Sequence, residues 1–310
     1  MKAIICTKYG APEVLQLIDT GKPVAGNNEV LIKVKATSVT ASDCIIRSLN
    51  VPFVLKMIIR IVIGFTKPRN PILGMSLSGV VETIGSRVTN LKTGDEVFGF
   101  NRFEFGTYAE YVCWPASRPI YLKPSNISSQ EAAAIPFGGL MALHFLRKAR
   151  LSSGQKILIY GASGAIGTAA VQLARHFGAH VTGVCGTQNL ELVSSLGAER
   201  VIDYTDENVP TVADTFDVIF DAVGRRKHSP FKALYKKSLS QNGIYLSVDD
   251  GTPKMRTEDL QYLANLVECG HIKAVIDRCY PLEKMVDAHR YVDKGHKKGA
   301  VVVSLVNDDD

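Results

Sequence analysis

The first 124 residues alternate short apolar segments with turns marked by glycine. Segments with strand character cover residues 29–36, 79–84, 95–100 and 107–114. Short strands at regular spacing, with turn signals between them, are typical of sandwiches and barrels. The pattern therefore predicts a β-rich, barrel-like domain over residues 1–124.

From residue 125 the pattern changes to helices and strands in alternation. Alanine-rich helices are expected around residues 130–134 and 139–148. Strands are then predicted at residues 156–160, 180–185, 201–202, 216–222 and 243–248, with helices at 165–177 and 190–196. This alternation indicates a parallel sheet with helices on both faces. Strand pattern returns at residues 274–280 and 300–306, so we expect a second domain over 125–273 and a return to the first domain over 274–310.

Residues 51–65 form the longest apolar stretch, which Lys56 and Arg60 interrupt. Because these cations are four residues apart, they share one side of a helix, and apolar side chains cover the rest. The stretch is shorter than the roughly 20 apolar residues that cross a bilayer. We expect a mostly buried helix; a helix at a membrane surface or a substrate entrance is the alternative.

Composition narrows the class of protein. A chain of 310 residues with 46% hydrophobic residues suits two domains, and its net charge of +6 is scattered rather than gathered into a nucleic-acid-binding stripe. The six cysteines form no CxxC pair, so we expect reduced thiols and no structural zinc. The N-terminus lacks the pattern of a secretory signal, and we expect a cytoplasmic protein without a membrane span.

A glycine-rich segment, Gly161-Ala162-Ser163-Gly164-Ala165-Ile166-Gly167, lies between a predicted strand and a predicted helix. In that context the motif indicates a dinucleotide site. Gly161 and Gly164 let the backbone turn and approach a pyrophosphate, and Gly167 lets helix and strand pack closely. The helix N-terminus offers free N–H groups to the phosphates.

The next predicted strand ends at Cys185, and Gly186 and Thr187 follow it. An NAD site usually has a carboxylate here, which binds the ribose hydroxyl. Without that carboxylate, the Gly186 and Thr187 backbone and the Thr187 hydroxyl can accommodate a 2′-phosphate. The sequence favours NADPH over NADH, although the loop contains no Arg or Lys.

These motifs, together with Lys2-Ala3-Ile4, Gly94 to Gly99, Leu196-Gly197-Ala198 and Gly295 to Gly299, make the chain resemble a medium-chain dehydrogenase/reductase of the zinc-free quinone oxidoreductase branch. The resemblance covers residues 1 to about 305. It implies an α/β protein, with a GroES-like β-barrel catalytic domain, a Rossmann doubly wound parallel-sheet domain and an active-site cleft between them. It also implies a homodimer.

The resemblance further assigns residues to the cofactor. Val223 and Gly224 are expected along the cofactor, and Ser247 and Val248 near the nicotinamide. Tyr204 is expected near the 2′-phosphate, with a simple surface aromatic as the alternative. Aromatic residues at the cleft mouth, or in the core, are Phe103, Phe105 and Tyr108. Arg225-Arg226-Lys227 either attracts phosphate or forms a solvated loop.

Zinc-dependent relatives carry a cysteine ligand three residues before an aspartate, and a Gly-His-Glu segment. Here Thr40 precedes Asp43, and the second segment reads Gly74-Met75-Ser76. The resemblance therefore implies an enzyme without zinc. Without a Lewis acid, a quinone, enone or enal is the expected acceptor, because hydride addition to it gives a delocalised anion. Thr40 is the candidate contact to the substrate oxygen or the nicotinamide, and Asp43 is the second candidate catalytic residue. Asp43 and Arg47 could form an ion pair, which either shapes the floor of the pocket or has a purely structural role.

Two other functions stay open on the sequence alone. One is a zinc-free reductase of saturated carbonyl compounds. The other is a non-catalytic NADPH-binding sensor or interaction protein. Both alternatives would carry the same cofactor motif as a quinone or enone reductase. Only a test of turnover can therefore separate the three functions.

Overall fold

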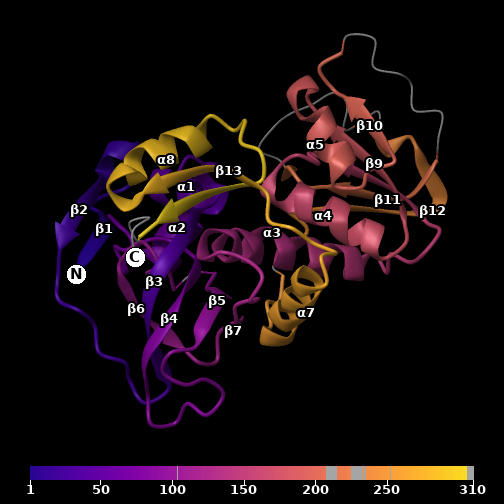
Figure 1. Ribbon diagram of the computed structural model, residues 1–310. Helices are drawn as coiled ribbons and strands as arrows, with labels where there is room; N and C mark the ends of the chain where they lie inside the picture. The colour runs from indigo at the N-terminus through magenta and orange to yellow at the C-terminus, as the bar shows by residue number, and fades with distance from the viewer. Residues whose placement is uncertain (103, 207–214, 225–232, 234, 252, 306–310) are drawn as a thin grey trace. The chain divides into compact units, whose positions relative to one another are not determined.

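A computed structural model describes residues 1–310 except 103, 207–214, 225–232, 234, 252 and 306–310 (Figure 1). The chain divides into two compact units. Unit 1 comprises Met1–Pro136, Arg256–Ala264 and Ile276–Asp310, and unit 2 comprises Phe137–Met255 and Asn265–Val275. The predicted boundary at residues 124 and 125 precedes helix α3 (Ser129–Lys148), whereas the two units divide inside that helix.

Unit 1 is built on a mixed sheet in the order β13-β14-β3-β4-β5-β7, with β6 also paired to β3. Its strands are β3 (Glu29–Val39), β4 (Ser76–Ile84), β5 (Glu96–Phe100), β6 (Tyr111–Pro115), β7 (Ile120–Leu122), β13 (Ile276–Pro281) and β14 (Ala300–Ser304). The C-terminal strand β14 lies antiparallel to β3. The smaller elements are β1 (Lys2–Cys6), β2 (Leu15–Asp19), α1 (Ala41–Ser48), α2 (Phe53–Ile63), α8 (Met285–Asp293) and the 3-10 turns Pro12–Val14 and Leu282–Lys284.

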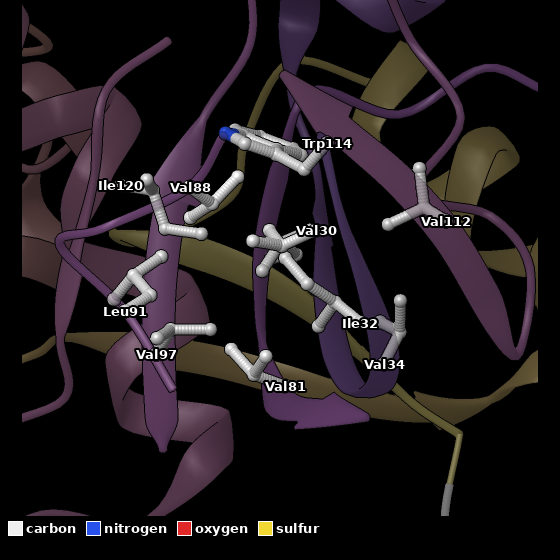
Figure 2. Packing of buried hydrophobic residues seen from close by; sticks show 11 residues of the cluster. Val30, Ile32, Val34, Val81, Val88, Leu91, Val97, Val112, Trp114 and Ile120 are labelled. Carbon is white, nitrogen blue, oxygen red and sulfur yellow. The ribbon is translucent and has the colours of Figure 1, made fainter. Parts of the chain in front are cut away.

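Alternation along the strands of unit 1 fills its core. Inward-facing apolar side chains come from Val30, Ile32, Val34, Leu77, Val81, Val88, Leu91, Val97, Val112, Trp114 and Ile120. Figure 2 shows these side chains gathered between the strands, with the Trp114 indole at one end of the cluster. Period-two patterning thus produces the β-rich domain that the sequence predicts.

Unit 2 holds a five-stranded parallel sheet in the order β10-β9-β8-β11-β12. Its strands are β8 (Lys156–Tyr160), β9 (His180–Cys185), β10 (Arg200–Asp203), β11 (Phe216–Asp221) and β12 (Leu239–Ser247), with helices α4 (Ala165–His176) and α5 (Leu190–Ser195) and the turn Thr187–Asn189. Helix α7 (Thr257–Glu268) contributes residues to both units. The five parallel strands with helices between them confirm the parallel sheet that the sequence predicts for this part of the chain.

Two helix predictions need correction. The helices expected around residues 130–134 and 139–148 are one helix, α3, which continues through Pro136. The helix expected to be buried at residues 51–65 is α2, and it is mostly exposed: Phe53 keeps 76% and Ile61 keeps 63% of its accessible surface. Periodicity identifies an apolar face, but it does not show whether any other element covers that face.

Candidate functional site

The predicted cofactor residues follow the carboxyl ends of neighbouring parallel strands. The strand pairs place Tyr160 beside Asp221, Asp221 beside Ser247, and Asp203 beside Cys185. Strand order reverses between β8 and β11, because β9 and β10 continue on one side of β8 and β11 lies on the other. Ligands of open α/β sheets bind at such a switch point, outside the carboxyl ends of the strands.

The glycine loop that follows β8 is held tightly at both ends and is open in the middle. A Cβ on Gly167 would lie 2.1 Å from the carbonyl oxygen of Gly161, and a Cβ on Gly161 would lie 2.3 Å from Val223 Cγ2. Gly161 also has a φ of +79°, which favours glycine. By contrast, among the described residues a Cβ on Gly164 would meet only the Gly161 oxygen, at 3.6 Å. Packing therefore explains two of the glycines and leaves Gly164 facing a space that the described residues do not fill.

The N-terminus of helix α4 faces this space. Gly164 is the N-cap residue, no side chain caps the first turn, and the first turn contains no acidic residue. An uncapped helix N-terminus combines free N–H groups with a positive partial charge, so it suits an anion such as a pyrophosphate. Ala162 is buried, and its N–H donates to the Val184 carbonyl at 3.0 Å, while Ser163 accepts a bond from Asn189 at 3.3 Å.

At the end of β9, Cys185 is buried and burial raises the pKa of its thiol to about 11. Gly186 follows, and a Cβ there would be 3.7 Å from Tyr204 Oη. Tyr204 therefore lies beside the loop that the sequence assigns to the adenosine end. The roles of these residues toward a cofactor stay predictions.

Sequence reasoning missed a carboxylate at this point. Asp203 ends the adjacent strand β10, and the Thr187 hydroxyl donates to it at 2.5 Å. Partial burial raises the pKa of Asp203, but hydrogen bonds from Thr187 and Thr205 outweigh burial and lower it overall. An anionic side chain thus stands beside Thr187. The pairing of strands β10 and β9 brings Asp203 beside Cys185. The sequence of β9 and the loop after it does not reveal this neighbour.

Asp221 organises the turn that holds Val223 and Gly224. One of its carboxylate oxygens accepts bonds from the N–H groups of both residues, each at 3.0 Å, and the other accepts from the Tyr245 hydroxyl at 3.2 Å. The Val248 N–H donates to the Asp221 carbonyl at 3.0 Å. The sequence analysis gives Asp221 no role in the site, although its hydrogen bonds hold the Val223–Gly224 turn and the segment at Val248.

The Ser247 turn is fixed by a second aspartate. The Ser247 N–H donates to Asp250 Oδ2 at 2.7 Å, and the Ser247 hydroxyl accepts from the Asp249 N–H at 3.3 Å. Asp249 also confines Gly224, because a Cβ there would lie 2.6 Å from Asp249 Oδ2. The turns after β11 and β12 are therefore packed against each other.

In unit 1, Thr40 and Asp43 form a capping box at the start of α1. The Thr40 N–H and hydroxyl donate to Asp43 Oδ2 at 2.8 and 2.6 Å, and the Asp43 N–H donates back to the Thr40 oxygen at 3.2 Å. The predicted Asp43–Arg47 pair is wrong. Arg47 instead binds Asp293 at 2.5 Å, because Asp43 is directed toward the N-terminus of its own helix.

Asp43 is fully buried, and the Gly74 N–H and the Tyr108 hydroxyl lie near its carboxyl group. Loss of hydration raises the pKa of its carboxyl to about 6, against the lowering effect of the bonds from Thr40. Close by in the same unit, the buried His289 ring contacts Tyr108 Oη at 3.2 Å and Cys44 Sγ at 3.5 Å. Burial lowers the pKa of His289 to about 3, so this ring is neutral.

The remaining candidates divide into buried and undescribed residues. Phe105 and Tyr108 are 4% and 0% exposed, so the core interpretation holds for them. Phe103 and residues 225–227 lie outside the described residues. Within the described part of the chain, no three His, Cys, Asp or Glu side chains are grouped as metal ligands.

Family profiles and known proteins match this chain over most of its length. The profile named "Alcohol dehydrogenase GroES-like domain" matches residues 26–125, and two profiles named "Zinc-binding dehydrogenase" match residues 165–241 and 245–303. The chain is 35% identical to 2-methylene-furan-3-one reductase of Solanum lycopersicum, covering 98% of this chain and 79% of the relative. It is 32% identical to the chloroplastic NADPH-dependent alkenal/one oxidoreductase of Arabidopsis thaliana, with the same coverage.

A solved structure resembles the whole chain. The quinone oxidoreductase from Coxiella burnetii superposes with a TM-score of 0.83 at 29% identity, covering 99% of both chains.

The different environments of two glycines generate the first prediction. Gly164→Ala should leave the free energy of unfolding within about 1 kcal/mol of wild type, because its Cβ has room. It should weaken NADPH binding at least about tenfold, and Gly164→Val more, because the side chain enters the anion space. Gly167→Ala should destabilise the fold by about 1–3 kcal/mol through overpacking. Calorimetric affinity and urea unfolding measure the two effects; an unchanged NADPH affinity in both Gly164 variants would show that the cofactor is misplaced.

The second prediction concerns the buried carboxyl of Asp43. Folding raises its pKa from 3.8 to about 6, so the folded state holds the proton more tightly and is favoured at low pH. This contribution is full below about pH 4 and is lost as pH rises through about 6, by roughly 3 kcal/mol in total. Urea unfolding of wild type and Asp43→Asn at several pH values should show this loss in wild type only. A difference between the two proteins that does not vary with pH contradicts the assignment.

Proposed function

The chain belongs to the medium-chain dehydrogenase/reductase superfamily, and on that premise we propose that it transfers hydride from NADPH to a quinone or an α,β-unsaturated carbonyl compound without using zinc. The relatives named above act, by their names, as reductases or oxidoreductases of such conjugated compounds. The observation that carries the proposal is the open position of Gly164, between two glycines that packing confines, at the switch point of the sheet.

The residues of unit 2 fit a dinucleotide. The Gly161–Gly167 loop and the α4 N-terminus would hold its pyrophosphate, and the Gly186, Thr187 and Tyr204 surface would hold its adenosine end. Val223, Gly224, Ser247 and Val248 would lie along the nicotinamide side. NADPH supplies the hydride when it is bound. The protein residues bind and orient it, and Asp221 fixes the backbone that would line it.

The absence of zinc is proposed from the residues at the family's ligand positions. Thr40, Met75 and Ser76 stand there, and a hydroxyl, a thioether and a second hydroxyl are poor substitutes for the thiolate and imidazole that zinc prefers. Met75 and Ser76 are also buried. The family profile is named for zinc binding, so this chain would depart from the zinc-dependent members of its superfamily.

Thr40 is proposed as the contact to the acceptor oxygen, and Asp43 as the residue that positions it. The Thr40 hydroxyl has one proton, and it donates this proton in a hydrogen bond to Asp43 while that carboxyl is ionised. When Asp43 is protonated it can donate to Thr40, and the Thr40 proton becomes available to an acceptor oxygen. Asp43 therefore acts through Thr40 by deciding where that hydroxyl donates.

A homodimer, which the family resemblance supports, and a cytoplasmic location complete the proposal, although one of the relatives named above is chloroplastic. Across the described residues, every helix is too short or too polar to traverse a bilayer.

The third prediction tests catalysis and metal independence together. The purified protein should oxidise NADPH in step with the loss of a small quinone, enone or enal, and a chelator should not slow it, because no residue at the zinc positions is a good zinc ligand. Absorbance of NADPH follows turnover, and metal analysis of the same preparation gives the zinc content. Binding of NADPH without turnover of any acceptor in the panel would support the sensor instead. One tightly held zinc per chain would overturn the zinc-free assignment.

The fourth prediction concerns the choice of cofactor, for which two substitutions change charge in opposite directions. Gly186→Asp adds an anion at a position where a Cβ has room, and should weaken NADPH binding by about tenfold to a hundredfold. Asp203→Asn removes an anion beside Thr187 and should strengthen NADPH binding by roughly tenfold. NADH, which lacks the 2′-phosphate, should respond much less to either change.

Dissociation constants for both cofactors in the three proteins measure this choice. Equal constants for NADPH and NADH in wild type contradict the preference. Parallel shifts of both cofactors in the variants would show that residues 186 and 203 do not face the 2′-phosphate.

A further inference from the structure

Helix α2 of unit 1 is labelled in Figure 1, and most of its apolar side chains are exposed. Its exposed apolar residues, with the one that follows its C-terminus, are Phe53, Val54, Leu55, Ile58, Ile61, Val62 and Phe65. Within the helix only Ile63 is buried. Isolated apolar residues are common on protein surfaces, but seven within 13 residues form a contiguous patch of the kind that marks an interaction surface.

The charged residues of the segment that carries this patch all have one sign. Residues 51–70 contain the cations Lys56, Arg60, Lys67 and Arg69, and no acidic residue occurs between Asp43 and Glu82. Among the described residues, Lys56, Arg60 and Lys67 form no ion pair. The side chain of Glu104, whose carbonyl accepts a bond from Asn70, is paired with Arg118. The apolar patch is therefore bordered by cations, three of which have no acidic partner among the described residues.

The turn after α2 adds a shaped hollow to the patch. A hollow of about 530 Å³ is lined by Arg60, Ile61, Gly64, Phe65, Thr66, Lys67, Pro68 and Arg69. The Tyr9 hydroxyl donates to the Gly64 carbonyl at 2.6 Å, which fixes the turn. Arg69 donates to the carbonyls of Val62 and Ile61 at 3.0 and 2.9 Å and so caps the helix. The Nε atom of Arg60 is buried and has no hydrogen-bond partner. The hollow thus offers cationic groups directly beside exposed apolar side chains.

We propose that α2 and the Gly64–Arg69 turn form a docking surface for an anionic phospholipid bilayer. Exposed apolar side chains would enter the boundary between headgroups and acyl chains, and the cations would contact lipid phosphates. At about 1.5 Å per residue, the 11-residue helix is about 16 Å long, roughly half the thickness of a bilayer core. The helix would therefore lie on the membrane surface.

Charge favours a bilayer over a second copy of the chain. A symmetric dimer across this patch would place the same surface on both sides, so four cations would face four like charges. An anionic bilayer instead offers phosphates to the cations and hydrocarbon to the apolar side chains. Vesicle binding detects this surface independently of the proposed activity.

Sedimentation with vesicles tests the proposal. The full-length protein should bind vesicles of phosphatidylcholine with phosphatidylglycerol, bind vesicles of phosphatidylcholine alone much less, and lose binding as salt rises. Ile61→Glu combined with Val62→Glu should weaken binding by about a hundredfold, because two apolar anchors become anions. Lys67→Gln should weaken it by about fivefold.

Matched controls separate the patch from general changes of charge. Val24 and Leu122 are exposed apolar residues outside the patch, at 89% and 47%, so Val24→Glu with Leu122→Glu adds the same charge elsewhere and should bind vesicles like wild type. Lys92→Gln is the control for Lys67→Gln. Circular dichroism confirms that each variant is folded.

Several outcomes would overturn the proposal. The proposal is excluded if the wild-type protein does not bind anionic vesicles. It is also excluded if the patch variants and the control variants lose vesicle binding equally. A dimer in light scattering that the Ile61/Val62 variant dissociates, without vesicle binding by wild type, would assign the patch to a second copy.

Discussion

The close approach of helix α4 to the end of strand β8 is the constraint on which the proposed cofactor site depends. A Cβ at Gly167 would lie 2.1 Å from the Gly161 oxygen, so the chain can start its helix this near the strand only with glycine there. That approach brings the helix N-terminus to the switch point of the sheet. Gly164, in the same loop, has no packing reason to be glycine, and this difference distinguishes a ligand site from an ordinary tight turn.

Buried and partly buried carboxylates have different structural roles in the two units. In unit 2, Asp221 accepts bonds from the N–H groups of Val223 and Gly224 and so holds a turn at the carboxyl edge of the sheet. Asp203, joined to Thr187, places an anion where a 2′-phosphate is proposed, which makes selectivity a balance between attraction and repulsion. In unit 1, Asp43 is buried beside Thr40, and the loss of hydration raises its pKa.

How well the sequence predicted each feature depends on how local its cause is. The Gly161–Gly167 loop was predictable because strand, turn and helix are adjacent in the chain. Asp203 was missed because it reaches Thr187, 16 residues away, through the pairing of β10 with β9. Arg47 was paired wrongly because its partner Asp293 is 246 residues away. The apolar residues of α2 were recognised but placed inside, since a sequence pattern gives the chemistry of a face and not what covers it.

The central claim is that this chain directs hydride to a conjugated carbon rather than to a carbonyl carbon. Incubation with an enone and NADPH that carries deuterium at both C4 positions tests it most directly. The predicted product is the saturated ketone with one deuterium at its β-carbon, located by nuclear magnetic resonance. Deuterium at the carbonyl carbon, in an allylic alcohol, would contradict the account.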